Sequence, residues 1–147
     1  MVKTIDRLGT FAQVIEGASE EVRAICEALR ALVVELHPDV VEVPRAGEGA
    51  ASYGFGEKKM SEAYAYVMPQ KTYANLGFFH GANLAAAHPA LEGTGAKLRH
   101  IKVRDLAAAQ SADVKRALVA AMRERAEALG LEPPTAAATG ARPKRRS

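Results

Sequence analysis

Residues 62–80, EAYAYVMPQKTYANLGFFH, carry the pattern that decides the fold. Apolar and polar side chains alternate over residues 62–68 and again over residues 73–80, as they do in strands whose two faces meet different surroundings. The four residues between the two runs, 69–72, include the Pro and polar side chains that are typical of a connection. The stretch therefore predicts a β-hairpin.

Alternation along the hairpin predicts two chemically different faces. In a register that pairs Met68 with Tyr73, Tyr66 lies across from Asn75 and Tyr64 across from Gly77. One face then carries Tyr64, Tyr66, Met68, Tyr73, Asn75 and Phe79. The other carries Ala63, Ala65, Val67, Leu76 and Phe78. We expect helices to pack on the second, small and aliphatic face, while the first is a partly open surface.

Three further segments with strand periodicity flank the hairpin. Val41 and Val43 alternate with Glu42, residues 51, 53 and 55 share one parity, and residues 98–104 place Ile101 and Val103 inward. His100, Lys102 and Arg104 then share the opposite face of the last strand. Together with the hairpin, these segments predict a sheet of about five strands.

Apolar residues at three- and four-residue spacing predict two amphipathic helices outside the strand region. The first spans residues 19–37, with Ser19 as N-cap and Pro38 as its stop, and the second begins after Ser111 and ends before Gly130. A weaker pattern over residues 5–15 predicts another short helical piece. The fold class is therefore α+β, a single mainly antiparallel sheet with N- and C-terminal helices packed on one face.

Composition predicts one domain, residues 1–132, followed by a disordered basic tail, residues 133–147. The net charge of +3 is unevenly distributed. Residues 45–104 hold eight Lys or Arg against four Glu, and the last six residues add four cations, so the centre and the tail are separately basic. We expect a cytoplasmic protein, because the N-terminus has no secretory apolar segment and Cys26 is the only cysteine.

Two longer stretches carry a family resemblance: SYGFGEKKMSEAYAYVMPQKTYANLGFFHGA, residues 52–82, and LEGTGAKLRHIKVRDL, residues 91–106. With them the chain resembles the small bacterial YdhG-like family, domain of unknown function 1801, over roughly residues 20–129. The resemblance implies a small α+β domain, mostly without assigned activity. It also implies a link to iron, since some relatives are described as frataxin-like intracellular iron chaperones. It supplies no catalytic motif.

No sequence motif predicts a catalytic residue or a resident metal site. The loop at residues 93–97, GTGAK, has one residue between its glycines and Leu98 after the Lys, unlike a Walker phosphate loop. The four histidines, His37, His80, His88 and His100, lack the spacing of a helical metal-binding pair. The acidic side chains of the first helix are also explained as surface ion pairs with Arg23 and Arg30.

Cations and aromatic residues concentrated between residues 53 and 102 favour a binding surface for a small anionic or polar ligand. The candidate ligand-binding residues are Tyr53, Lys58, Tyr66, Lys71, Asn75, Lys97, His100 and Lys102. The alternatives are solvated strand cations that protect an edge, iron delivery as the resemblance implies, and protein–protein contact or self-association through the open sheet face. Arg142–Arg146 would attract nucleic acid only weakly, and we expect no membrane partner.

Overall fold

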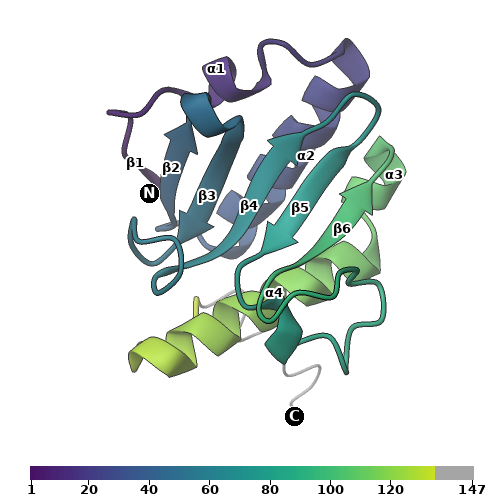
Figure 1. The fold of residues 1–147 in the computed structure, drawn as a ribbon. Helices are drawn as coiled ribbons and strands as arrows, with labels where there is room; N and C mark the ends of the chain where they lie inside the picture. Colours follow the sequence, from purple (N-terminus) through teal and green to yellow (C-terminus); the bar gives the residue numbers. More distant parts are fainter. Residues whose placement is uncertain (135–147) are drawn as a thin grey trace.

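A six-stranded sheet organises the molecule (Figure 1). In the computed structural model, which describes residues 1–134, the strands lie side by side in chain order. They are β1 Lys3–Thr4, β2 Val41–Arg45, β3 Ala50–Gly54, β4 Ala63–Pro69, β5 Ala74–Phe78 and β6 Arg99–Val103. β1 runs parallel to β2, and all other neighbours are antiparallel. The α+β class is confirmed, and the short β1 adds a sixth strand to the five expected.

Two long helices match the predicted segments. They are α2 Glu20–Leu36 and α4 Ala112–Leu129. The hydroxyls of Ser19 and Ser111 accept hydrogen bonds from the N–H groups of Val22 and Val114, as N-caps do. Gly130 ends α4 at a φ of 71°, in the left-handed region that glycine adopts without strain.

The shorter helical elements were predicted only in part. The expected piece at residues 5–15 is reduced to α1 Phe11–Ile15, which begins at a capping box formed by Thr10 and Gln13. α3 Leu106–Ala109 and the 3-10 turns η1 Ala46–Glu48 and η2 Gly81–Asn83 complete the described helical content. They are too short for a hydrophobic period, so the sequence pattern does not detect them.

The hydrophobic core lies between one face of the sheet and the helices. Its members are all buried, and α2 contributes Leu29 and Val33 while α4 contributes Leu118 and Met122. From the sheet they meet apolar side chains that were predicted to face helices, Ala65, Val67, Leu76 and Phe78. The prediction that helices pack on one sheet face is therefore correct. In Figure 1 the long α2 passes behind the strands.

The hairpin register differs from the one expected. Met68 pairs with Asn75 and Tyr66 with Gly77, because Pro69 still belongs to β4 and pairs with Ala74. The turn is closed instead by a 2.8 Å hydrogen bond from Gln70 N to the Tyr73 carbonyl. The shift is two residues, so the alternation survives and Tyr66, Met68 and Asn75 still share a face.

Tyr64 is the exception, and its predicted place on the open face is wrong. The register between β3 and β4 shifts at Gly54, which pairs with Ala63 while Tyr53 pairs with Ala65. Tyr64 is thus the extra residue of a β-bulge and turns into the core, where its hydroxyl lies 2.8 Å from His37 Nδ1. Gly54 permits this approach, because a Cβ there would lie 2.3 Å from the Ala63 Cα.

The sheet surface opposite the helices, which we call the front face, carries Val43, Ser52, Tyr66, Asn75 and Lys102. Figure 1 looks onto it. The connection between β3 and β4 covers part of it, since Arg45 Nη2 donates a 2.9 Å hydrogen bond to the Glu57 carbonyl. Val43 is 1% exposed although it lies outside the main core.

The described residues bear only in part on two further predictions, the absence of a membrane partner and the disordered tail. Among the helices of residues 1–134, none combines the length and the apolar character needed to cross a membrane. Apart from Pro133 and Pro134, the predicted disordered tail lies outside the described residues.

Candidate functional site

The strand register gathers four of the predicted ligand-binding residues on the front face. Tyr66 pairs with Gly77, and Gly77 in turn pairs with His100. Asn75 pairs with Lys102 in the adjacent row. All four side chains are partly exposed, so the middle of β4, β5 and β6 presents a phenol, an amide, an imidazole and an ammonium on one surface.

Tyr66 leans across β5 because Gly77 leaves room for its ring. A Cβ built on Gly77 would lie 1.9 Å from the Tyr66 Cζ, which no real contact allows. On its other side the ring meets Phe79, with centroids 5.3 Å apart and planes at 51°. Burial raises the pKa of the Tyr66 phenol, so the group stays protonated and can donate or accept a hydrogen bond.

Tyr73, the residue before β5, contacts two cations through its ring. Lys102 Nζ lies 5.7 Å from the centre of its ring, and the guanidinium carbon of Arg104 lies 5.3 Å from it. Both distances are within the range of a cation–π contact. The Tyr73 ring thus holds the positive charges of Lys102 and Arg104 on the front face near Asn75.

A hollow next to Tyr66, which we call the Ser52 hollow, lies over β2, β3 and β4 and is bordered by Leu98, the residue before β6. Its volume is about 160 Å³. Among its lining residues are Arg45, Ser52, Tyr66, Met68, Phe79 and Leu98. Lys59 and Glu48 also line it and form an ion pair of 2.7 Å with each other. The hollow therefore has apolar and aromatic walls, one buried hydroxyl and a charged rim.

Three buried side-chain atoms of the described chain have no hydrogen-bond partner, and all three belong to front-face residues. They are Arg45 Nε, Ser52 Oγ and Asn75 Oδ1. A buried polar atom without a partner costs about 1–3 kcal/mol, and most proteins contain few of them. All three therefore lack a partner among the described residues and lie on the face that the two long helices leave uncovered.

The four other predicted residues are not part of this group. Tyr53 is fully buried on the helix side of the sheet, where its hydroxyl donates to Glu42 Oε2 at 2.9 Å. Tyr53 therefore cannot contact a ligand on the front face. Lys58, Lys71 and Lys97 are exposed in three separate connections between strands. The sequence analysis grouped these three lysines because all of them lie in the basic segment, residues 45–104. In the fold they belong to three different loops.

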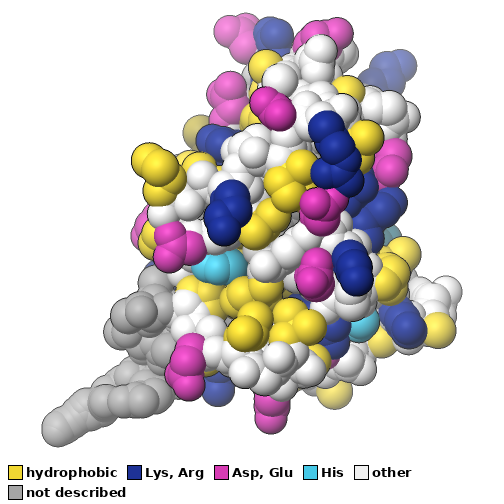
Figure 2. Space-filling view, turned by 90° about the vertical axis from the view of Figure 1, so that its left-hand side faces the viewer, with side chains coloured by type: hydrophobic (Ala, Val, Ile, Leu, Met, Phe, Trp, Pro, Cys, Tyr) yellow, Lys and Arg dark blue, Asp and Glu magenta, His cyan; other side chains and the backbone are white. Residues whose placement is uncertain are grey.

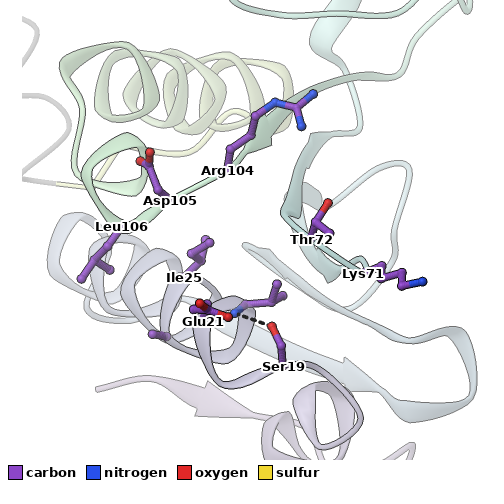
Figure 3. Close-up of a pocket in the computed structure, with 10 residues that line it drawn as sticks. Ser19, Glu21, Ile25, Lys71, Thr72, Arg104, Asp105 and Leu106 are labelled. Carbon is purple, nitrogen blue, oxygen red and sulfur yellow. Dashed lines mark hydrogen bonds between the residues drawn. The ribbon is translucent and has the colours of Figure 1, made fainter.

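Lys71 instead borders a cavity of about 560 Å³ at the N-terminus of α2 (Figure 3). Its charged neighbours are Glu21, Arg104 and Asp105. Figure 3 shows the Lys71 and Arg104 side chains pointing away from Ser19, whose hydroxyl already caps the Val22 N–H. With two carboxylates on its lining and its cations turned outward, this cavity is poorly arranged to hold an anion.

The charges on the side of the molecule that Figure 2 shows are mixed. On the side that carries β1, Lys and Arg side chains are interspersed with Asp and Glu (Figure 2). Pairs such as Arg7 with Glu57 and Met1 N with Asp39 account for part of this mixing. Among residues 1–134, no three His, Cys, Asp or Glu side chains lie close enough to hold a metal ion together.

Tyr66 is the one lining residue of the Ser52 hollow among the predicted ligand-binding residues, and those that the sequence analysis missed include Arg45, Ser52 and Leu98. A partial signal exists for the first two, because residues 43, 45, 50 and 52 face one way when the strands pair as β2 and β3. That signal depends on the length of the intervening η1 turn, which residue types alone do not determine. Leu98 lines the hollow only because of how the segment before β6 folds, and no local pattern predicts that fold.

Comparison of the chain with protein-family models, with curated proteins and with solved structures finds no match. The resemblance to the YdhG-like family therefore stays a prediction, and the site must be argued from its own geometry.

Proposed function

We propose that this protein is a cytoplasmic binding domain of the YdhG-like type whose front face takes a small anionic or polar ligand. One observation carries the proposal. The three unpartnered buried atoms, Arg45 Nε, Ser52 Oγ and Asn75 Oδ1, all belong to the sheet face that no long helix covers.

A bound ligand would satisfy the hydrogen-bonding capacity of these three atoms. A ligand with complementary donors and acceptors would supply the hydrogen bonds that the protein lacks, and so recover the free energy that their burial costs. Binding sites commonly combine apolar walls with a few polar groups placed in this way.

Charge on the same face favours a negative or strongly polar ligand. Lys102 and Arg104 are held on the Tyr73 ring, and His100 lies in the next row of β6. Cations positioned by a rigid sheet can attract an anion without first being ordered, which lowers the entropic cost of binding. The proposal includes no reaction step.

The test is a titration of the ¹⁵N-labelled full chain with inorganic phosphate and with citrate, followed by backbone amide chemical shifts. We expect saturable shifts on the front face, in strands β2 to β6, with dissociation constants of the order of a millimolar. Replacing Lys102 with Gln should weaken the response severalfold. The matched control, Lys115→Gln, removes an exposed cation from α4 and should leave the response unchanged.

Two results would reject the proposal. One is an absence of saturable shifts on the front face with every anion tried, including the monocarboxylates used below. The other is an equal response in the Lys102→Gln and Lys115→Gln proteins together with shifts spread over the whole surface, since that pattern indicates unspecific charge attraction.

A further inference from the structure

We infer that the Ser52 hollow is a binding site for a small monocarboxylic acid with a single-ring or similarly compact apolar body. The inference rests on the proposed function and specifies the ligand class and its seat. It places the carboxylate against Ser52 and Arg45, and the apolar body between Tyr66, Met68, Phe79 and Leu98.

The size of the hollow sets the size of the ligand. A cavity of about 150 Å³ with apolar lining accommodates one benzene ring. The Ser52 hollow is close to this, at about 160 Å³. A one-ring acid or a short branched acid therefore fills the space.

The walls favour an apolar body. Tyr66 and Phe79 present two rings with centroids 5.3 Å apart, and Met68 adds a flexible thioether side chain. Leu98, which lines the hollow, is 46% exposed in the structure. A bound ring would cover part of it, which is favourable because apolar surface leaves water.

The polar groups favour a carboxylate. Ser52 is 2% exposed, lines the hollow and has no partner for its hydroxyl. Arg45 lies two residues along the same face of the β2–β3 pair, and its Nη2 is already bound to the Glu57 carbonyl while its Nε is unpartnered. An O–H and a guanidinium N–H are both donors, and an ionised carboxylate is a pure acceptor that can take both hydrogen bonds.

The charge balance of the hollow fits one negative charge. Arg45 and Lys59 contribute two cations and Glu48 one carboxylate, which leaves an excess of one positive charge. The two carboxylates near Arg45 each have a cation of their own, since Glu48 is paired with Lys59 and Glu57 with Arg7. Within the described chain, Arg45 itself forms no ion pair. A monocarboxylate neutralises it, whereas a neutral alcohol leaves it unpaired and a metal cation is repelled.

The first test compares three probes on the full chain by amide chemical shifts and calorimetry: benzoate, benzyl alcohol and acetate. Benzoate has both the ring and the charge, and each of the others lacks one of them. We expect benzoate to bind at least about tenfold more tightly than either, since charge-assisted hydrogen bonds and ring burial each contribute. Its largest shifts should fall at residues 45, 52, 66, 79 and 98.

Three variants locate the site. Ser52→Ala should weaken benzoate binding severalfold while leaving the melting temperature of the free protein unchanged or slightly raised, because the hydroxyl has no partner to lose. Arg45→Gln should weaken it further, and Leu98→Trp should block it by filling the hollow from an exposed position that tolerates a larger ring. Lys58→Gln, a nearby exposed cation outside the lining, is the matched control.

Failure of this inference is distinguishable from failure of the proposed function. Shifts in β5 and β6 with phosphate or citrate, but none with benzoate, would overturn the inference alone. Equal binding of acetate and benzoate, or benzoate binding unaffected by both Ser52→Ala and Leu98→Trp, would do the same. If no anion shifts any amide signal of the front face, the inference and the proposed function are both rejected.

Discussion

Glu42 and Ser52 are polar residues buried on neighbouring strands, yet their surroundings are opposite. Glu42 is 1% exposed on the helix side, and Ser52 is 2% exposed on the front face. The Glu42 carboxylate accepts hydrogen bonds from Arg30 Nε and Nη2 at 2.5 and 3.0 Å. It accepts two more, from the hydroxyls of Tyr53 and Thr4, both at 2.9 Å. The Ser52 hydroxyl has no partner.

The difference separates a group that stabilises the fold from one that is available to a ligand. Burial alone would raise the pKa of Glu42, but hydrogen bonds from Arg30, Tyr53 and Thr4 outweigh it and leave the pKa below its usual value. The Glu42 carboxylate is therefore charged and fully hydrogen-bonded, and it links β1, β2 and α2 through Thr4 and Arg30. Ser52 contributes nothing comparable to the fold, so its hydroxyl can be used elsewhere.

The largest expected effect comes from breaking the Glu42 cluster. Arg30→Met leaves a buried carboxylate without its counter-ion, and we expect it to lower the free energy of unfolding by about 3 kcal/mol. Urea denaturation followed by circular dichroism measures this. Arg116→Met is the control, because Arg116 and Asp113 form an exposed pair whose loss costs less than about 0.5 kcal/mol. Equal losses in the two variants would contradict the structural role of the cluster.

Next in size is the effect of filling the space under Tyr66. Gly77→Ala places a methyl group where the ring lies, so the ring or the strand must move, and we expect a loss of about 2 kcal/mol. The variant should also weaken anion binding, since the wall of the hollow shifts. In a Tyr66→Ala background the same glycine change should cost little, and a double-mutant cycle measures that coupling. Additive losses would show that the ring is not the obstacle.

A pH effect of similar or smaller size is expected from His37 on the helix side. Burial lowers the pKa of His37 to about 4, against a weaker raising influence of Asp39. The unfolded chain therefore takes up a proton before the folded one does. Stability is full above about pH 6.5 and falls as the pH drops toward 4, by about 2 kcal/mol after solvent screening.

His37→Gln should flatten the stability profile between about pH 6.5 and pH 4.5, above the range where carboxylates such as Glu42 protonate. Chemical denaturation at several pH values is the measurement. His88→Gln serves as the control and should keep the slope. A profile that is already flat in the unmodified protein would contradict the buried, neutral state of His37.

The smallest effects provide the most direct test of the comparison. Tyr53→Phe removes a hydrogen bond to the Glu42 carboxylate and should cost about 1.5 kcal/mol. Ser52→Ala removes a buried hydroxyl that has no partner among the described residues, so it should leave the free energy of unfolding unchanged or raise it by up to about 1 kcal/mol. Thermal and urea unfolding of the two variants side by side would sharpen the contrast, and a larger loss for Ser52→Ala would abolish it.

Local patterns were sufficient for most of the fold. The two long helices, their serine caps and the alternating strands follow from side-chain period and turn chemistry, which act over a few residues. The sharing of a face by Tyr66, Met68 and Asn75 was predicted correctly even though the pairing was two residues out, because a shift of two preserves parity. A bulge has no such signal, and Tyr64 was therefore assigned to the wrong face.

The candidate site was predictable only in part for the same reason. Tyr66, Asn75, His100 and Lys102 are brought together by strand pairing that their own alternation already indicated. Ser52 and Arg45 were missed, since nothing in a serine or an arginine reveals that its polar atom lacks a partner. That property belongs to the surroundings of the residue.

The amino-acid sequence by itself thus determined the α+β class, the two helices, the strand periods and the basic, aromatic character of the central segment. These features depend on interactions between residues close in the chain. Only the tertiary structure decided that Tyr53 and Tyr64 are core residues, that three predicted lysines lie apart, and that unpartnered polar atoms gather on the front face. Burial and hydrogen-bond satisfaction depend on segments far apart in the chain, and their pairing exists only once the sheet has formed.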